Sequence, residues 1–81
     1  MIDEVRKMEN RTNTEMNKKI GEMLQKARMS KRLTQGEVAK HIGISEHHLS
    51  AIERGISKAS VEVLLGYCEI LSISPNDILG F

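Results

Sequence analysis

The sequence predicts an all-α protein, a compact bundle of five helices, on three observations. Its 81 residues suffice for one small domain whose single core gives modest stability. Hydrophobic residues make up 40% of the chain, yet only Tyr67 and Phe81 are aromatic. A core of aliphatic side chains, with Met in the gaps, suits packed short helices better than sheets. Strand-like alternation is rare and the chain has one proline, whereas helical periodicity and helix caps recur along it.

Composition also narrows the setting in which the protein works. No apolar run is long enough to span a membrane and no signal peptide is recognisable, so we expect a soluble cytoplasmic protein without membrane contact. The lone Cys68 cannot form an internal disulfide, which fits a reducing compartment.

Residues 1–16 are polar, mixed in charge and weakly patterned. Thr12 followed by Glu15 resembles a capping box, so the first main helix is expected to start there or near Asn17. The segment is either a disordered arm, which the weak pattern favours, or a helix that faces a protein partner. The folded domain is expected to occupy residues 17–81.

The first main helix is predicted to run to about Lys31, with Ile20, Leu24 and Ala27 on its buried side. Residues 17–32 also hold six Lys and Arg residues against one Glu, although the net charge of the whole chain is only +1. Such a basic helix is either a solvated surface or a surface that contacts phosphate groups.

Two short helices and a tight turn follow, within residues 35–54. Thr34 caps the first of them and Glu37, three residues later, completes a capping box. Gly43 tolerates the left-handed backbone at its end, and Ser45 is a good N-cap for the second helix. Apolar residues fall on one face of each helix, namely Val38, Ala39 and Ile42 on the first and Leu49 and Ile52 on the second. This arrangement is a helix-turn-helix unit.

A fourth helix is predicted from about Val61 to Leu71, after Ser60 as N-cap, with a buried stripe of Val61, Leu64, Leu65, Cys68 and Leu71. Gly66 in its middle is costly unless another element approaches closely there. Ser74, Pro75 and Asp77 predict the start of a fifth helix. The end of the chain is more apolar than so short a segment needs, so part of it is expected to contact a second copy.

The motif resembles the lambda-repressor-like, Cro/repressor-type (XRE family) DNA-binding domains, and the resemblance runs from about Ile20 to Leu79. The residues that carry it are Thr34-Gln35, Val38-Ala39, Gly43-Ile44-Ser45, Leu49, Ile52-Glu53 and Gly55. The resemblance implies a transcriptional regulator, a repressor above all, that binds double-stranded DNA. A single domain of this size buries little surface on DNA, so we expect a homodimer on two half-sites.

The resemblance also implies roles for individual residues. Because Leu49 and Ile52 point inward, the opposite side of their helix faces the major groove. The expected base-contacting residues are Ser45, Glu46, His47, Ser50 and Ala51, and the expected phosphate-contacting residues are Thr34, Gln35, Arg54 and Lys58.

Arg28 and Glu53 occupy positions that form an ion pair in the resembled family. A half-buried pair would orient two helices, whereas two unrelated surface charges are the alternative.

Neither a metal site, a cofactor nor catalysis is expected. His47 and His48 are adjacent, so on a helix their side chains diverge by about 100°. His41 and Cys68 are not at ligand-like spacing from them. No Ser/His/Asp or Cys/His set has supporting context, which leaves the enzyme class without a candidate site. A second class is an antitoxin-type regulator that binds a partner protein through residues 1–16 while it represses its own operon.

Overall fold

The computed structural model describes the backbone of residues 2–73 and the side chains of residues 14–73. Within that part of the chain all regular structure is helical: α1 (Ile2–Ser30), α2 (Gln35–Ile42), α3 (Glu46–Glu53) and α4 (Val61–Leu71). The all-α class is thus confirmed there. The predicted fifth helix, with its start at Ser74, lies outside the described residues. None of the helices in the described part has the length and apolar character that crossing a membrane requires.

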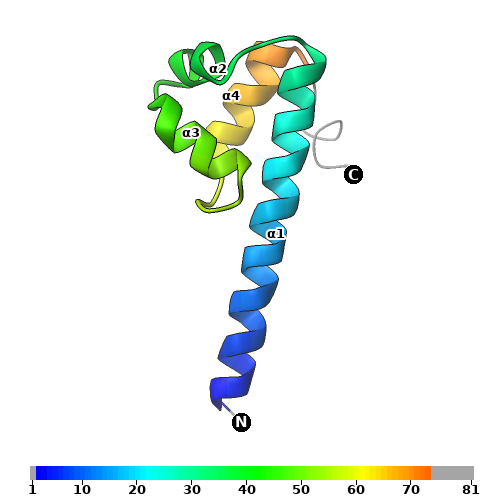
Figure 1. Cartoon of the computed structure of the whole chain (residues 1–81), viewed down its shortest axis with the longest axis vertical. Helices are drawn as coiled ribbons and strands as arrows, with labels where there is room; N and C mark the ends of the chain where they lie inside the picture. Colours follow the sequence, from blue (N-terminus) through cyan, green and yellow to red (C-terminus); the bar gives the residue numbers. More distant parts are fainter. Residues whose placement is uncertain (1, 74–81) are drawn as a thin grey trace.

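The helix α1 is much longer than predicted. It begins at Ile2 instead of Thr12 or Asn17, and its N-terminal half extends past the other three helices (Figure 1). No glycine or proline interrupts residues 2–20, so a helix that is held by packing at its C-terminal end meets no strong breaker along that stretch. The backbone of residues 2–16 is thus helical throughout, and a role for this segment in binding a partner protein stays a prediction.

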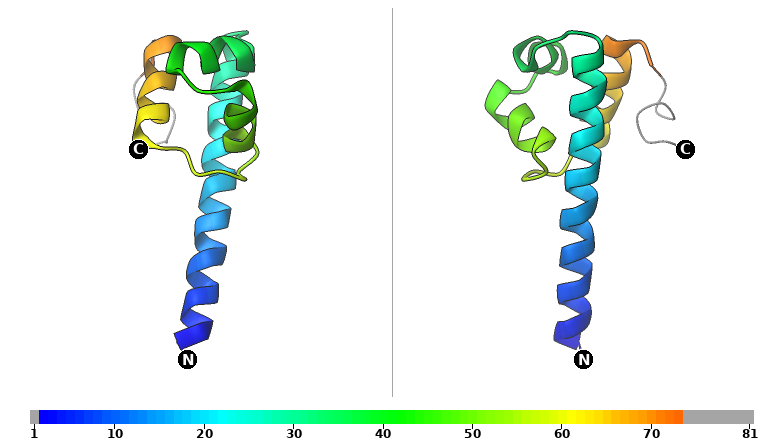
Figure 2. Two further views of the ribbon diagram at one scale, coloured as in Figure 1. Left: turned by 90° about the vertical axis from the view of Figure 1, so that its left-hand side faces the viewer. Right: turned by 45° about the vertical axis from the view of Figure 1, so that its right-hand side comes forward.

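The core lies where the four helices meet, and every helix contributes to it. Its five largest fully buried side chains are Tyr67, Leu24, Leu49, Ile52 and Val38. The helices α2, α3 and α4 gather around the C-terminal half of α1, with α2 and α3 on one side of it and α4 on the other in the right view of Figure 2. The helix α1 packs against α3 and α4, and α2 packs against the same two helices. This arrangement holds α3 in place from behind.

The turn between α2 and α3 follows the predicted local chemistry. Thr34 and Glu37 form the capping box, with both hydrogen bonds at 3.1 Å. Gly43 adopts φ +91°, a left-handed backbone, and the hydroxyl of Ser45 accepts a hydrogen bond from the backbone nitrogen of His48. These predictions are confirmed, and together they fix the angle at which α3 leaves α2.

The end of α3 packs tightly against α1. A Cβ atom on Gly21 would lie 2.5 Å from the carbonyl oxygen of Ile52, and one on Gly55 would lie 2.6 Å from Cα of Lys18. Gly55 also adopts φ +78° as the chain leaves the helix. Two glycines, one on each side of the contact, therefore let α1 approach the last turn of α3.

The predicted buried stripe of α4 is wrong at two positions. Val61 is 70% exposed and Leu65 is 55% exposed, whereas Val63 and Tyr67 are buried beside Leu71. Apolar residues cover more than one face of this helix, so its periodicity alone permits more than one buried face. The packing against α1 and α2 selects the face that carries Tyr67.

Candidate nucleic-acid interface

The helix α3 presents a polar side to solvent and an apolar side to the core. Leu49 is 0% exposed and Ile52 is 1% exposed, so both anchor the helix as predicted. The five expected base-contacting residues lie on the rest of the helix surface and at its cap. Ser45, Glu46 and His47 are exposed, and Ser50 and Ala51 are half-buried. The structure thus places His47, Ser50 and Ala51 on the outward side of α3. Ser45 is the N-cap of the helix, and the carboxylate of Glu46 lies beside Gly36 of α2.

Two expected phosphate-contacting residues lie just beyond the end of α3. Arg54 is the C-cap residue of that helix, and its exposed side chain donates a long hydrogen bond, 3.4 Å from Nε to the carbonyl oxygen of Ser50. Lys58 is exposed in the loop that leads to α4. Both cationic groups are therefore accessible to solvent beyond the end of α3.

The other two expected phosphate-contacting residues lie at the start of α2. The exposed Thr34 uses its hydroxyl oxygen as the helix cap, which leaves the hydroxyl hydrogen available as a donor. Gln35 is half-buried, and its Nε2 donates a 3.0 Å hydrogen bond to Oε1 of Glu53. One N–H of that amide is thus directed into the protein. The second N–H of the amide and the backbone N–H groups at the N-terminus of α2 are the donors left to bind an anion.

The carboxylate of Glu53 joins all four helices. Arg28 on α1 donates to it twice, from Nε at 2.8 Å and from a terminal nitrogen at 3.0 Å. The Tyr67 hydroxyl on α4 donates at 2.6 Å, and Gln35 on α2 adds the bond described above. The remaining terminal nitrogen of Arg28 donates to the carbonyl oxygen of Leu33 at 2.7 Å. The implied pair of Arg28 and Glu53 is therefore a buried contact within a larger network.

The electrostatics of this network keep each group in the protonation state that the geometry requires. Burial raises the pKa of Glu53, but hydrogen bonds from Arg28, Tyr67 and Gln35 together with the charge of Arg28 outweigh burial, so the net pKa lies below the usual range. The hydrogen bond to Glu53 raises the pKa of Arg28 despite burial. Burial and the hydrogen bond to Glu53 raise the pKa of Tyr67, which keeps its hydroxyl a donor.

The sequence matches a protein-family model over the same region that forms this interface. The model described as Helix-turn-helix matches residues 24–78, which contain α2, α3 and α4 together with the C-terminal turns of α1. The chain belongs to the XRE-type helix-turn-helix family. The sequence resemblance is confirmed by this match.

Relatives of this helix-turn-helix protein include regulators of known structure. The restriction-modification controller protein C.AhdI from Aeromonas hydrophila is 27% identical with a TM-score of 0.71, over 76% of this chain and 94% of that one. The clp gene regulator ClgR from Corynebacterium glutamicum is 33% identical with a TM-score of 0.74, over 78% and 67% of the two chains.

One relative of the chain is named as an antitoxin rather than as a regulator. Antitoxin PezA from Streptococcus pneumoniae serotype 4 is 38% identical over 61 residues, which are 75% of this chain. The chain spans 39% of the length of that relative. The likeness therefore concerns less than half of that protein.

Two hydrogen bonds to Glu53 in this helix-turn-helix protein were not predicted from the sequence, one from Tyr67 and one from Gln35. The sequence carried one usable signal, because Tyr67 is the single phenol on an apolar helix and a buried Tyr hydroxyl needs a partner. A second unpredicted contact joins α2 to α4, where His41 Nε2 lies 3.4 Å from Oε1 of Glu69. Among the described side chains, no three His, Cys, Asp or Glu residues are grouped as metal ligands would be.

Proposed function

We propose that this XRE-type protein is a sequence-specific double-stranded DNA-binding protein that regulates transcription, as a repressor that occupies an operator. The observation that carries the proposal is that α3 has an apolar and a polar side. Leu49 and Ile52 anchor the helix in the core, while its outward side is polar and accessible. An α-helix presented in this way fits the major groove of B-DNA. Family membership and the two regulators among the solved structures support the same function.

Base recognition in this proposal rests on the outward residues of α3 and its cap. The carboxylate of Glu46 accepts from the amino group of cytosine, and His47 donates to guanine or serves adenine N7. Ala51 contacts a thymine methyl group, while Ser45 and Ser50 complete the polar surface. Since a carboxylate also repels phosphate, Glu46 favours a register in which it lies deep in the groove.

Phosphate contacts set the register. Thr34 and the second N–H of Gln35 grip the backbone at the start of α2, and Arg54 and Lys58 grip it beyond the end of α3. The basic side chains of the C-terminal half of α1 add a positive potential that steers the protein to DNA.

The proposal includes a symmetric dimer, no enzymatic activity and action in the cytoplasm, where the DNA of the operator lies. One domain of this size buries too little surface for tight specific binding, so two half-sites about one helical turn, or about 34 Å, apart are expected.

Selection of bound DNA from a random duplex pool tests the proposal directly. The expected outcome is an inverted repeat whose half-site centres are about 10 base pairs apart. The double variant His47→Ala/Ala51→Ser should select a changed half-site with unchanged spacing, whereas Glu15→Gln on the exposed side of α1 serves as the control. A pool that shows no enrichment would contradict sequence-specific binding.

A second candidate function keeps the fold and makes protein binding the main task, as in an antitoxin-type regulator. The curated relative named as an antitoxin and the extension of α1 past the other helices favour this candidate. Co-expression with the product of the adjacent gene tests it. A stable complex that is lost on removal of residues 1–16 would support it, and DNA binding by that shortened chain shows that the domain still folds.

A further inference from the structure

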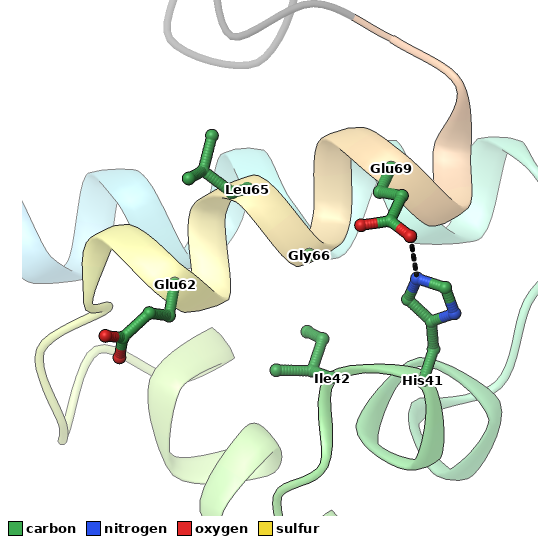
Figure 3. Close-up of a pocket in the computed structure, with 6 residues that line it drawn as sticks. All are labelled: His41, Ile42, Glu62, Leu65, Gly66 and Glu69. Atoms are coloured by element: carbon green, nitrogen blue, oxygen red, sulfur yellow. Dashed lines mark ion pairs between the residues drawn. The ribbon is translucent and has the colours of Figure 1, made fainter.

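A recess of about 310 Å³ lies between the last turn of α2 and the outer side of α4 (Figure 3). Six residues from these two helices line it: His41, Ile42, Glu62, Leu65, Gly66 and Glu69. This volume is at the lower end of the range for ligand pockets, about 300–1,000 Å³. The recess therefore suits one or two inserted side chains better than a cofactor.

The floor of the recess is apolar because Gly66 has no side chain, which lets Ile42 pack directly against the backbone of α4. A Cβ atom on Gly66 would lie 2.6 Å from Cγ1 of Ile42, so Ile42 packs against the bare backbone of α4. Leu65 forms an edge of the recess, is 55% exposed and points away from Ile42 in Figure 3, so the half-buried Ile42 is the apolar side chain inside the recess. Covering such side chains with another apolar group removes them from water, which is favourable.

The rim of the recess is acidic at both ends. Glu62 and Glu69 are seven residues apart, two turns of α4, and Figure 3 shows them on either side of Gly66. The side chain of Glu69 is 76% exposed. The sequence of α4 contains no Lys or Arg, and the facing basic group is His41, 3.4 Å from Glu69. A rim of this charge repels nucleic acid and attracts cationic side chains.

The recess is separate from the surface proposed to bind DNA. None of its lining residues belongs to α3, and α3 and α4 lie on opposite sides of the space beneath α2 in the left view of Figure 2. Binding in the recess is therefore compatible with α3 in a major groove.

We propose that this recess docks a helical segment of another protein, one that carries a large apolar side chain between two Lys or Arg residues. On a helix, residues four before and three after the apolar side chain lie on the same face. The apolar side chain packs on Ile42 beside Gly66, while one cation pairs with Glu62 and the other joins His41 at Glu69. The match in charge and spacing selects a basic amphipathic helix over an acidic one.

The test uses a synthetic peptide of about 18 residues, long enough to be helical with an Ala/Gln background. Leucine occupies its centre, with lysine four residues before and three after it. Titration into the full chain, followed by amide chemical shifts, should perturb Ile42, Leu65 and Gly66. Replacing the central leucine by alanine should weaken binding about tenfold. Replacing both lysines by glutamate should abolish it.

Variants of the protein separate the recess from general charge attraction. The double variant Glu62→Gln/Glu69→Gln should bind the peptide about three- to tenfold more weakly than the wild type. The matched control is Glu15→Gln/Glu22→Gln, which removes two exposed carboxylates seven residues apart on α1 and should leave peptide affinity unchanged. DNA binding by both variants reports separately on the proposed function, because neither pair of residues lies in the DNA surface.

Three outcomes would overturn the proposal. One is no binding of the lysine peptide to the wild-type chain at millimolar concentration. Another is an equal loss in the two double variants, which would indicate unspecific attraction. The third is a change from dimer to monomer in Glu62→Gln/Glu69→Gln, measured by sedimentation, which would mean that a second copy of the chain occupies the recess.

Discussion

The hydroxyl of Tyr67 lies 2.6 Å from a carboxylate oxygen of Glu53. Glu53 is the last residue of α3, so this bond ties the end of the proposed recognition helix to α4. Arg28 and Gln35 tie the same carboxylate to α1 and α2. Among the described side chains, no buried polar atom lacks a hydrogen-bond partner. The orientation of α3 is therefore fixed by a satisfied polar network as well as by Leu49 and Ile52.

Glu53→Gln should lower the free energy of unfolding by about 3–5 kcal/mol, because it leaves the charge of Arg28 buried without its counter-ion. Tyr67→Phe, which removes one donor and keeps the ion pair, should cost less, about 1.5–3 kcal/mol. Denaturant unfolding followed by circular dichroism measures both. Arg28→Met/Glu53→Leu is the control, and it should be more stable than Glu53→Gln because no charge stays buried. An equal loss in all three variants would contradict the electrostatic reason.

Stability should fall in acid because of Glu53. Its pKa is lower in the folded than in the unfolded chain, since burial, which raises it, is outweighed by the hydrogen bonds and charge of its partners. Its contribution is therefore complete above the ordinary pKa of about 4.3 and is lost as pH falls through the lower pKa of the folded state. Unfolding curves between pH 3 and pH 7 should show a steeper decline for the wild type than for Glu53→Gln. Parallel profiles would assign the acid sensitivity to other carboxylates.

Local chemistry explains why the turn could be predicted from the sequence. The capping box of Thr34 and Glu37, the left-handed Gly43 and the cap at Ser45 each depend on residues within four positions. The side of α3 that faces the core follows as well, since two apolar positions define it.

The buried face of α4 and the hydrogen bonds of Tyr67 and Gln35 to Glu53 could not be predicted in the same way, whereas the pair of Arg28 and Glu53 was implied by the family resemblance. Val61 and Leu65 are as apolar as Val63, so the choice among them depends on where α1 and α2 pack. The bond from Tyr67 to Glu53 joins residues 14 positions apart on different helices. Such contacts follow from tertiary packing, which no local pattern records.

Alanine should have opposite effects at two helical glycines, one inside the contact between α1 and α3 and one outside it. Gly21→Ala should destabilise the fold, because its Cβ would lie 2.5 Å and 2.6 Å from the backbone oxygens of Ile52 and Glu53. Gly36→Ala on α2 should stabilise by up to about 1 kcal/mol, since its nearest neighbour is the flexible carboxylate of Glu46 at 3.4 Å. Thermal unfolding of the two variants measures the difference. Equal melting temperatures would show that α1 shifts easily at this contact.

Arg54→Ala/Lys58→Ala should weaken operator binding about equally for all sequences that the wild type binds. Both side chains are exposed beyond the end of α3 and are proposed to neutralise phosphates, so they contribute charge and no base preference. A plot of log affinity against log salt concentration should lose about one unit of slope for each residue removed. The control is Lys40→Ala, an exposed lysine on α2 outside the proposed contacts, which should leave the slope unchanged. An unchanged slope in the double variant would place the DNA on another surface of the protein.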